Sequence, residues 1–60
     1  MGSNFAVGDR VTALVDLGRG VTKGTHGTVT SVSAFHGLVT VRFRNGTELP
    51  SIKLHQITHA

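Results

Sequence analysis

Residues 24–29, which read Gly-Thr-His-Gly-Thr-Val, decide the fold expected of this 60-residue chain. A second stretch of the same design, residues 7–11 (Val-Gly-Asp-Arg-Val), stands a short distance upstream. In each, glycine supplies a positive φ or room for a close neighbour, and the valine and threonine around it favour pleated, extended backbone. Two such glycine-led strand starts in so short a chain are typical of a very small, strongly bent β-barrel.

Alternation of apolar and polar side chains predicts five short strands, at residues 10–15, 26–33, 38–44, 47–49 and 55–58. The third strand alternates most clearly, and it turns Thr40, Arg42 and Arg44 outward. The side chains expected to face inward from the first and third strands are Val11, Ala13, Val15, Val39, Val41 and Phe43.

The connections between these strands carry signals of their own. Val29 and Val32 are three positions apart instead of two, which predicts a bulge in the second strand. Asn45-Gly46 predicts a type I′ hairpin turn. Pro50 lacks an N–H and is expected to end the pairing of the fourth strand or to lie at a sheet edge. The other expected features are a long loop at 16–24, a turn at 34–37, a 3₁₀ turn at 51–54, and Leu54 and Ile57 facing the core.

The composition describes one small domain without covalent cross-links. Residues 5–58 are expected to form the domain, residues 1–4 a disordered or expression-derived start, and residues 59–60 a C-terminal tail. Cysteine is absent, which excludes a disulfide and a thiolate metal site and is typical of a reducing cytoplasm. No apolar stretch approaches the ~20 residues that a membrane span needs. A cytoplasmic location with no membrane partner is therefore expected.

The titratable residues form no pattern typical of catalysis or metal binding. Nucleophilic catalysis needs a serine or threonine beside a base that a third group orients, and a barrel this small offers no deep pocket. A helix would bring His55 and His59 together, but the β-rich residues between them disfavour a helix there. We therefore expect no enzyme, no cofactor, no metal site and no small-molecule substrate. The histidines interpreted as surface residues are His26, His36, His55 and His59.

Aromatic side chains are scarce, with three phenylalanines and no tryptophan or tyrosine. Phe43 is assigned to the core and Phe5 to the base of the barrel, which leaves Phe35 as the exposed aromatic. This shortage disfavours a groove for proline-rich peptides, an aromatic cage for methylated lysine, and a platform on which bases stack.

The chain resembles the SH3-like small barrels over residues 5–58. Within that group its first half is similar to the KOW-type motif of certain ribosomal proteins and of the C-terminal domain of NusG-like transcription factors. The positions that carry this similarity are Gly8, Asp9, Arg10, Val11, Lys23, Gly24, Gly27, Val29 and Val32. Residues 43–57, with Thr47 and Gln56-Ile57, also resemble the end of a NusG-like domain. The resemblance implies five short antiparallel strands, a long first loop and a 3₁₀ turn before the last strand. The loop before Lys23 is longer here than in the compact KOW form.

A weaker similarity leads to the plasmid-borne type II dihydrofolate reductases, which are SH3-like barrels assembled around a central pore. It rests on residues 5–11 together with Pro50, Leu54 and Ile57. That family places Val-Gln-Ile-Tyr before the proline, whereas residues 46–49 here read Gly-Thr-Glu-Leu. The pore glutamine and tyrosine are missing, so the shape is retained as an expectation and the enzyme is not.

The charge balance favours a polyanionic partner. Six Lys and Arg against three Asp and Glu give a net charge of +3, and a basic surface gains affinity by releasing counterions from phosphates. If the 16–24 loop folds over the outer face of the third strand, five cations line one groove able to hold an RNA or DNA backbone. These candidate nucleic-acid-binding residues are Arg19, Lys23, Arg42, Arg44 and Lys53. Backbone N–H groups of Gly18, Gly20 and Gly24 are expected to add anion contacts.

The leading hypothesis is thus a small non-catalytic adaptor that binds nucleic acid or a ribonucleoprotein. Two other interpretations stay open. Arg42 and Arg44 are also the kind of charges that keep an edge strand from pairing with another molecule. The rival function is a protein-interaction or self-assembly module, which buries Phe35, Leu38 and Leu49 against a protein partner or a second copy.

Overall fold

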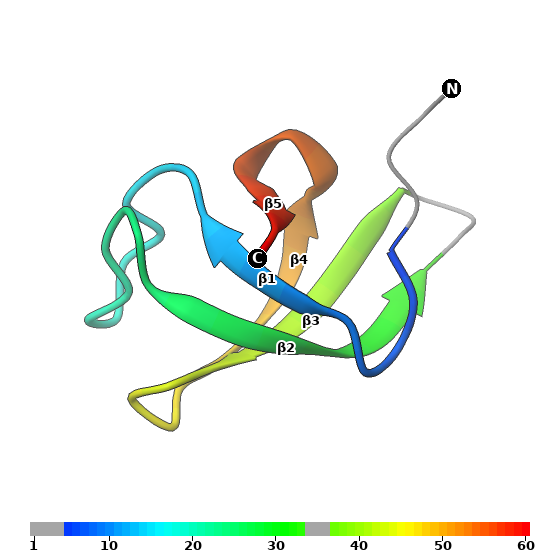
Figure 1. Cartoon of the computed structure of the whole chain (residues 1–60), viewed down its shortest axis with the longest axis horizontal. Coiled ribbons are helices and arrows are strands. Elements are labelled where there is room, and N and C mark those ends of the chain that lie inside the picture. The colour runs from blue at the N-terminus through cyan, green and yellow to red at the C-terminus, as the bar shows by residue number, and fades with distance from the viewer. Residues whose placement is uncertain (1–4, 34–36) are drawn as a thin grey trace.

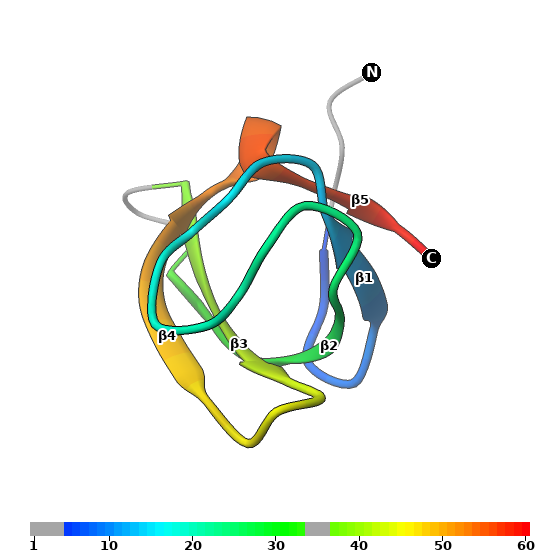
Figure 2. The ribbon, with the colours of Figure 1, turned by 90° about the vertical axis from the view of Figure 1, so that its left-hand side faces the viewer.

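Five short antiparallel strands form one sheet in the order β4-β3-β2-β1-β5 (Figure 1). The computed structural model describes residues 5–33 and 37–60. The elements are β1 (Arg10–Ala13), β2 (His26–Ser33), β3 (Leu38–Phe43), β4 (Glu48–Lys53), the 3₁₀ turn η1 (Leu54–Gln56) and β5 (Ile57–His59). Because this short turn joins the two edge strands, the sheet curls round into a barrel-like shape (Figure 2). The expected all-β fold, with a long first loop and a 3₁₀ turn before the last strand, is confirmed.

The inner face of the curled sheet holds one apolar core. Alternate side chains of β3 supply much of it, and Val39, Val41 and Phe43 are each at most 2% exposed, as a period of two requires. Leu54 packs against the edge of this core. The buried residues are Phe5, Val11, Ala13, Val21, Val29, Val39, Val41, Phe43, Leu49, Ile52 and Ile57.

Gly27 allows β2 to lie unusually close to β3. It pairs with Phe43 and faces the interior. A Cβ at this position would lie 2.7 Å from Val41 Cγ1 and 2.8 Å from the carbonyl oxygen of Arg42. The other expected use of glycine, a positive φ, occurs at Gly8 (97°) and Gly24 (93°). Both roles predicted for the glycine-led strand starts are therefore confirmed.

Bulges bend two of the strands. The pairing of β2 with β3 shifts register between Val29 and Ser31, as the spacing of the valines predicts. A second shift, between Val39 and Val41 of β3, lies opposite the Pro50-Ser51 segment of β4, where Ser51 has a φ of 61°. Pro50 thus does not end the strand. It lies in an edge strand, which was the other expectation, because an edge position tolerates the missing N–H.

The hairpin at Asn45-Gly46 is not the predicted type I′ turn. That turn needs a positive φ at both central residues, and of these two only Gly46 has one (85°). Gly46 N donates to Phe43 O (2.9 Å) and Phe43 N donates to Thr47 O (2.8 Å). The loop is therefore a three-residue one that ends on a left-handed glycine, and the Asn45 side chain accepts a hydrogen bond from Thr47 N (3.0 Å).

Several strand limits differ from the predicted ones. β1 ends at Ala13, which is its last residue in register with β5, and Val15 beyond it is 43% exposed. The fourth strand runs on to Lys53, so the 3₁₀ turn begins at Leu54 rather than at residue 51, and β5 begins at Ile57. Gln56 Oε1 accepts from Lys53 N (3.0 Å), which closes the turn at this later position. Most of the turn expected at 34–37 lies outside the described residues.

Residues 59–60 are not a free tail. His59 is the last residue of β5 and pairs with Val11, and its ring stacks on Phe5 with the centroids 4.3 Å apart. His59 Nε2 also lies 3.3 Å from Asp9 Oδ2. Ala60 N donates to Arg10 O (3.0 Å). Pairing with β1 thus reaches the last residue.

Within the described ranges, no helix has the length and hydropathy needed to cross a membrane.

Val21 is a core residue that strand periodicity does not predict, because it lies in the loop between β1 and β2. It is 1% exposed, and its N–H donates to Gly18 O (2.9 Å). We expect Val21→Ala to lower the free energy of unfolding by about 2 kcal/mol, since two buried carbon atoms are lost. The measurement is denaturant unfolding, with Val7→Ala as the matched control because Val7 is 65% exposed. Equal midpoints for the two variants would contradict this role of Val21.

Candidate nucleic-acid interface

A row of outward side chains crosses four strands of the sheet. Arg10 of β1 pairs with Thr28 of β2, and Thr28 pairs with Arg42 of β3. Arg42 in turn pairs with Glu48 of β4. Because neighbouring strands lie about 4.8 Å apart, the backbones of Arg10 and Arg42 are roughly 10 Å apart, with the threonine between them.

A second outward row lies two residues away from the first along β1 and β2. His26 pairs with Thr12, and Thr12 Oγ1 lies 3.0 Å from His26 Nδ1. On the other side of β2, Arg44 N donates to His26 O (3.0 Å). These contacts place Arg44 and His26 side by side, next to the row that holds Arg10 and Arg42.

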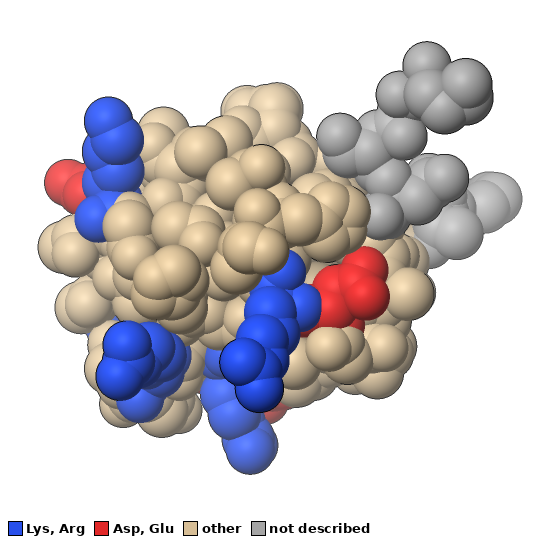
Figure 3. Space-filling model, in the orientation of Figure 1, with Lys and Arg blue, Asp and Glu red and all other residues tan. Residues whose placement is uncertain are grey.

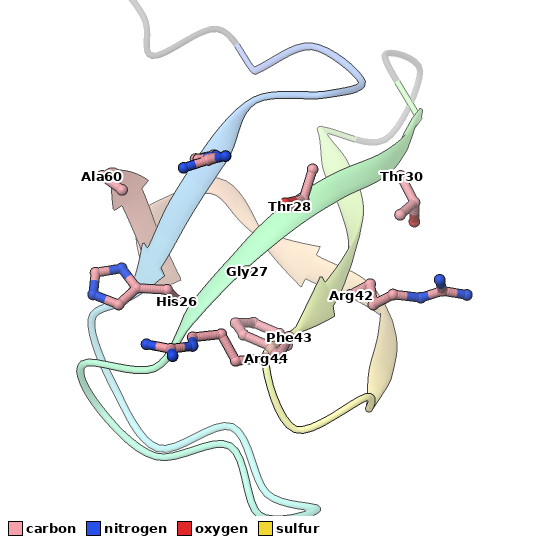
Figure 4. A pocket seen from close by; sticks show the side chains of 9 residues that line it. His26, Gly27, Thr28, Thr30, Arg42, Phe43, Arg44 and Ala60 are labelled. Carbon is pink, nitrogen blue, oxygen red and sulfur yellow. The ribbon is translucent and has the colours of Figure 1, made fainter.

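The two rows surround a hollow of about 800 Å³ over the outer face of β2, which we call the β2 groove. Figure 4 shows the Arg44 side chain extending toward His26 and the Arg42 side chain extending the opposite way. The two guanidinium groups therefore flank the groove instead of forming one cluster. The residues that line the β2 groove are Arg10, His26, Gly27, Thr28, Thr30, Arg42, Phe43, Arg44 and Ala60.

None of the groove arginines forms an ion pair with an acidic residue of the described chain, although Arg42 and Glu48 are partners in the strand register. The chain has three acidic residues, all within the described ranges, and each already has another partner. Glu48 Oε2 accepts from Thr30 Oγ1 (2.7 Å), Asp16 Oδ1 accepts from Lys23 N (2.8 Å), and Asp9 Oδ2 accepts from Ala6 N (2.9 Å). In the described residues the single ion pair joins Asp9 to His59. The guanidinium groups are thus available to an external anion.

Several basic side chains lie together on the face seen in Figure 3. In Figure 3, most of the Lys and Arg side chains visible from this direction lie in the lower half of the view, where β2 and the β3–β4 hairpin run in Figure 1. All six basic residues outside the histidines are exposed. Since three arginines and no acidic residue line the β2 groove, the groove has a local excess of positive charge.

The five cations predicted to share one groove do not all do so. Arg42 and Arg44 line the β2 groove, whereas Arg19, Lys23 and Lys53 do not. The 16–24 loop does not fold over the outer face of β3. Its tip contacts the β3–β4 hairpin, where Asn45 Nδ2 donates to Arg19 O (3.4 Å). Lys53 pairs with Leu38, at the opposite end of β3 from Arg42.

Arg10 and His26 are groove residues that the sequence analysis did not select. Alternation already placed Arg10 outward, because it directly precedes the buried Val11. What brings Arg10 beside Arg42 is the pairing of both with Thr28. The sequence pattern therefore predicts that Arg10 faces outward, but it does not predict that Arg10 lies near Arg42. Strand order and register depend on residues that are far apart in the chain.

The residues expected to form a protein-interaction surface are not brought together as one. Leu49 is 8% exposed and belongs to the core, because it pairs with Val41 and turns inward. Leu38 is half-buried, and Phe35 lies outside the described residues. Among the described residues, the exposed large apolar side chains are Val7, Leu14, Val15 and Val32.

The other candidate features are distributed as follows. His26 and His55 are exposed, as predicted, and His36 lies outside the described residues. No group of three or more metal-ligating side chains occurs in the part of the chain that the structure describes. Gly18 (φ 86°), Arg19 (54°) and Gly20 (82°) are three successive left-handed residues at the tip of the 16–24 loop. That conformation costs a residue with a Cβ roughly 1–2 kcal/mol.

Comparison of the chain with family models, curated proteins and solved structures finds no match. Fold and site together define a small all-β, barrel-like domain with an arginine-lined groove on its outer face. The functional assignment therefore depends on the geometry and charge of this chain.

Proposed function

We propose that this chain is a non-catalytic nucleic-acid-binding module that holds a phosphodiester backbone in the β2 groove. The observation that carries the proposal is that Arg10, Arg42 and Arg44 surround one hollow and none is paired with an acidic side chain of the described chain. The planar guanidinium group suits phosphate, because its N–H groups can donate two parallel hydrogen bonds to phosphate oxygens.

The spacing of the cations favours a chain of phosphates over a single small anion. The backbones of Arg10 and Arg42 stand about 10 Å apart across β2, and Arg44 lies two residues, roughly 7 Å, further along the chain, just past the end of β3. Thr28 lies between the first two and adds a hydroxyl group to the floor of the groove. A ligand that contacts all three arginines must carry several negative charges over that distance, as a nucleic-acid backbone does.

The groove is suited to contacting backbone and not to reading bases. Phe43 is the one phenylalanine among the lining residues, and it is 1% exposed, so a base cannot stack on its ring. Phosphate contacts position a protein but carry no sequence information. Binding without sequence preference is therefore expected. The similarity of residues 8–11 and 23–32 to KOW-type motifs supports an RNA or DNA partner.

The first test is binding of wild-type protein to a fluorescent single strand of about 12 random nucleotides, followed by anisotropy between about 50 and 200 mM salt. Three phosphate contacts predict a log–log slope of affinity against salt near −2, because a single strand releases about 0.7 counterion per contact. A peptide nucleic acid of the same sequence, which lacks phosphates, is the control and is expected not to bind.

Light scattering on the same samples distinguishes the proposed function from the rival function, a self-assembly module. A monomer that binds the oligonucleotide supports the proposal. Absence of binding at the lowest salt, with an oligomer whose size does not depend on salt, would support a self-assembly module instead.

A further inference from the structure

We infer that Arg19 is a second, separate contact point for the same backbone, so that the binding surface extends from the β2 groove over the β3–β4 hairpin to the tip of the 16–24 loop. This inference rests on the proposed function. It goes beyond that function by making affinity depend on the length of the nucleic acid and by assigning that dependence to one residue outside the groove.

The first observation is that the loop tip is attached to the hairpin that follows Arg44. Asn45 Nδ2 and Thr47 Oγ1 both donate to the carbonyl oxygen of Arg19, each at 3.4 Å. The contact is close on the neighbouring residue as well, because a Cβ on Gly20 would lie 3.1 Å from Asn45 Nδ2. Figures 1 and 2 show the loop and the hairpin at the same end of the barrel. The backbone of Arg19 is thereby held against the β3–β4 hairpin, outside the β2 groove.

The second observation is the backbone conformation of Arg19. Its φ is 54°, between two glycines whose φ values are also positive. Glycine or asparagine is the usual residue in this conformation, because their backbones enter it at little cost. The local fold thus does not require an arginine, and its exposed side chain forms no ion pair with a described acidic residue. We assign the side chain to a contact with an external anion.

A nucleic acid must have a minimum length to contact both the β2 groove and Arg19. Two residues of strand, the hairpin and one side-chain contact separate Arg42 from Arg19, which amounts to at most about 20 Å along the surface. One strand of a stacked nucleic acid carries a phosphate about every 3.4 Å, so roughly six phosphates are needed to join the points. A shorter strand occupies the β2 groove alone.

The test compares single strands of about 4 and about 12 nucleotides at about 50 mM salt. Arg19→Asn removes the charge and keeps a residue that tolerates a positive φ. It is expected to weaken binding of the longer strand about fivefold, to reduce the salt slope by about 0.7, and to leave the shorter strand unaffected. Arg19→Lys is expected to restore binding to within about twofold, because phosphate is also bound by a point charge. Lys53→Asn, a change at an exposed cation outside both points, is the matched control.

The outcomes separate this inference from the function on which it rests. Equal affinities of Arg19→Asn and Lys53→Asn for the longer strand, while groove variants lose binding, would overturn the inference and leave the function standing. An equal loss of affinity for both strand lengths would also overturn it, because Arg19 would then act through the groove. If wild-type protein binds neither strand, both proposals fail. Arg19→Gly and denaturant unfolding of every variant exclude a folding defect as the cause.

Discussion

Gly27→Ala is expected to lower the free energy of unfolding by about 2–3 kcal/mol, the cost of forcing an extra carbon into a filled core. The new Cβ would meet Val41 Cγ1 at 2.7 Å, Phe43 Cδ1 at 2.9 Å and the Arg42 carbonyl oxygen at 2.8 Å. Side chains can rotate away, but the backbone oxygen cannot move without shifting β3. For a domain of this size, with roughly 0.1 kcal/mol of stability per residue, that is a large share of the total.

Denaturant unfolding measures this effect, and Thr28→Ala is the matched control because it alters the next residue of β2 on the exposed face. The control is expected to change stability by at most about 0.5 kcal/mol. Since β3 carries Arg42, Gly27→Ala is also expected to weaken oligonucleotide binding wherever the protein still folds. Unfolding of Gly27→Ala at the wild-type midpoint would show that β2 and β3 are not in the close contact described.

The double variant Arg42→Glu, Arg44→Glu is expected to weaken oligonucleotide binding about a hundredfold at about 50 mM salt. Each charge-assisted hydrogen bond to phosphate contributes at least about 1.5 kcal/mol, close to a factor of ten. The slope of affinity against salt is expected to fall by about 1.4, because two contacts of a single strand are lost. Both side chains are exposed, so the fold is expected to be retained.

Anisotropy across a salt series measures this loss, with Lys53→Glu as the control for net charge. Lys53 is exposed and lies outside the β2 groove. Its reversal is expected to change affinity by less than about threefold, since Lys53 makes no phosphate contact in the groove and salt weakens its longer-range effect. An equal loss in the two proteins would show that overall charge, and not the groove, attracts the nucleic acid.

Much of the fold follows from short-range patterns. The limits of β2 and its bulge follow from the period of two and its interruption between Val29 and Val32. The inward positions Val39, Val41 and Phe43 follow from the same alternation. The ends of the strands are predicted less accurately than the inward-facing positions. Val15 continues the alternation of β1 but lies beyond Ala13, the last paired residue of the strand, and is therefore exposed.

In the candidate site too, local sequence patterns predict the orientation of the side chains but not which of them become neighbours. Local alternation alone establishes that Arg42 and Arg44 face away from the core, because neighbouring side chains on a strand point to opposite faces. Which cations become neighbours depends on strand order, and strand order joins positions far apart in the chain. Thr28 pairs with both Arg10 and Arg42, which creates the groove. Contact of the 16–24 loop with the hairpin keeps Arg19 out of that groove and holds its backbone against Asn45 and Thr47. Leu49 was also not predictable from local sequence. It was expected at the surface, but its pairing with Val41 directs its side chain into the core.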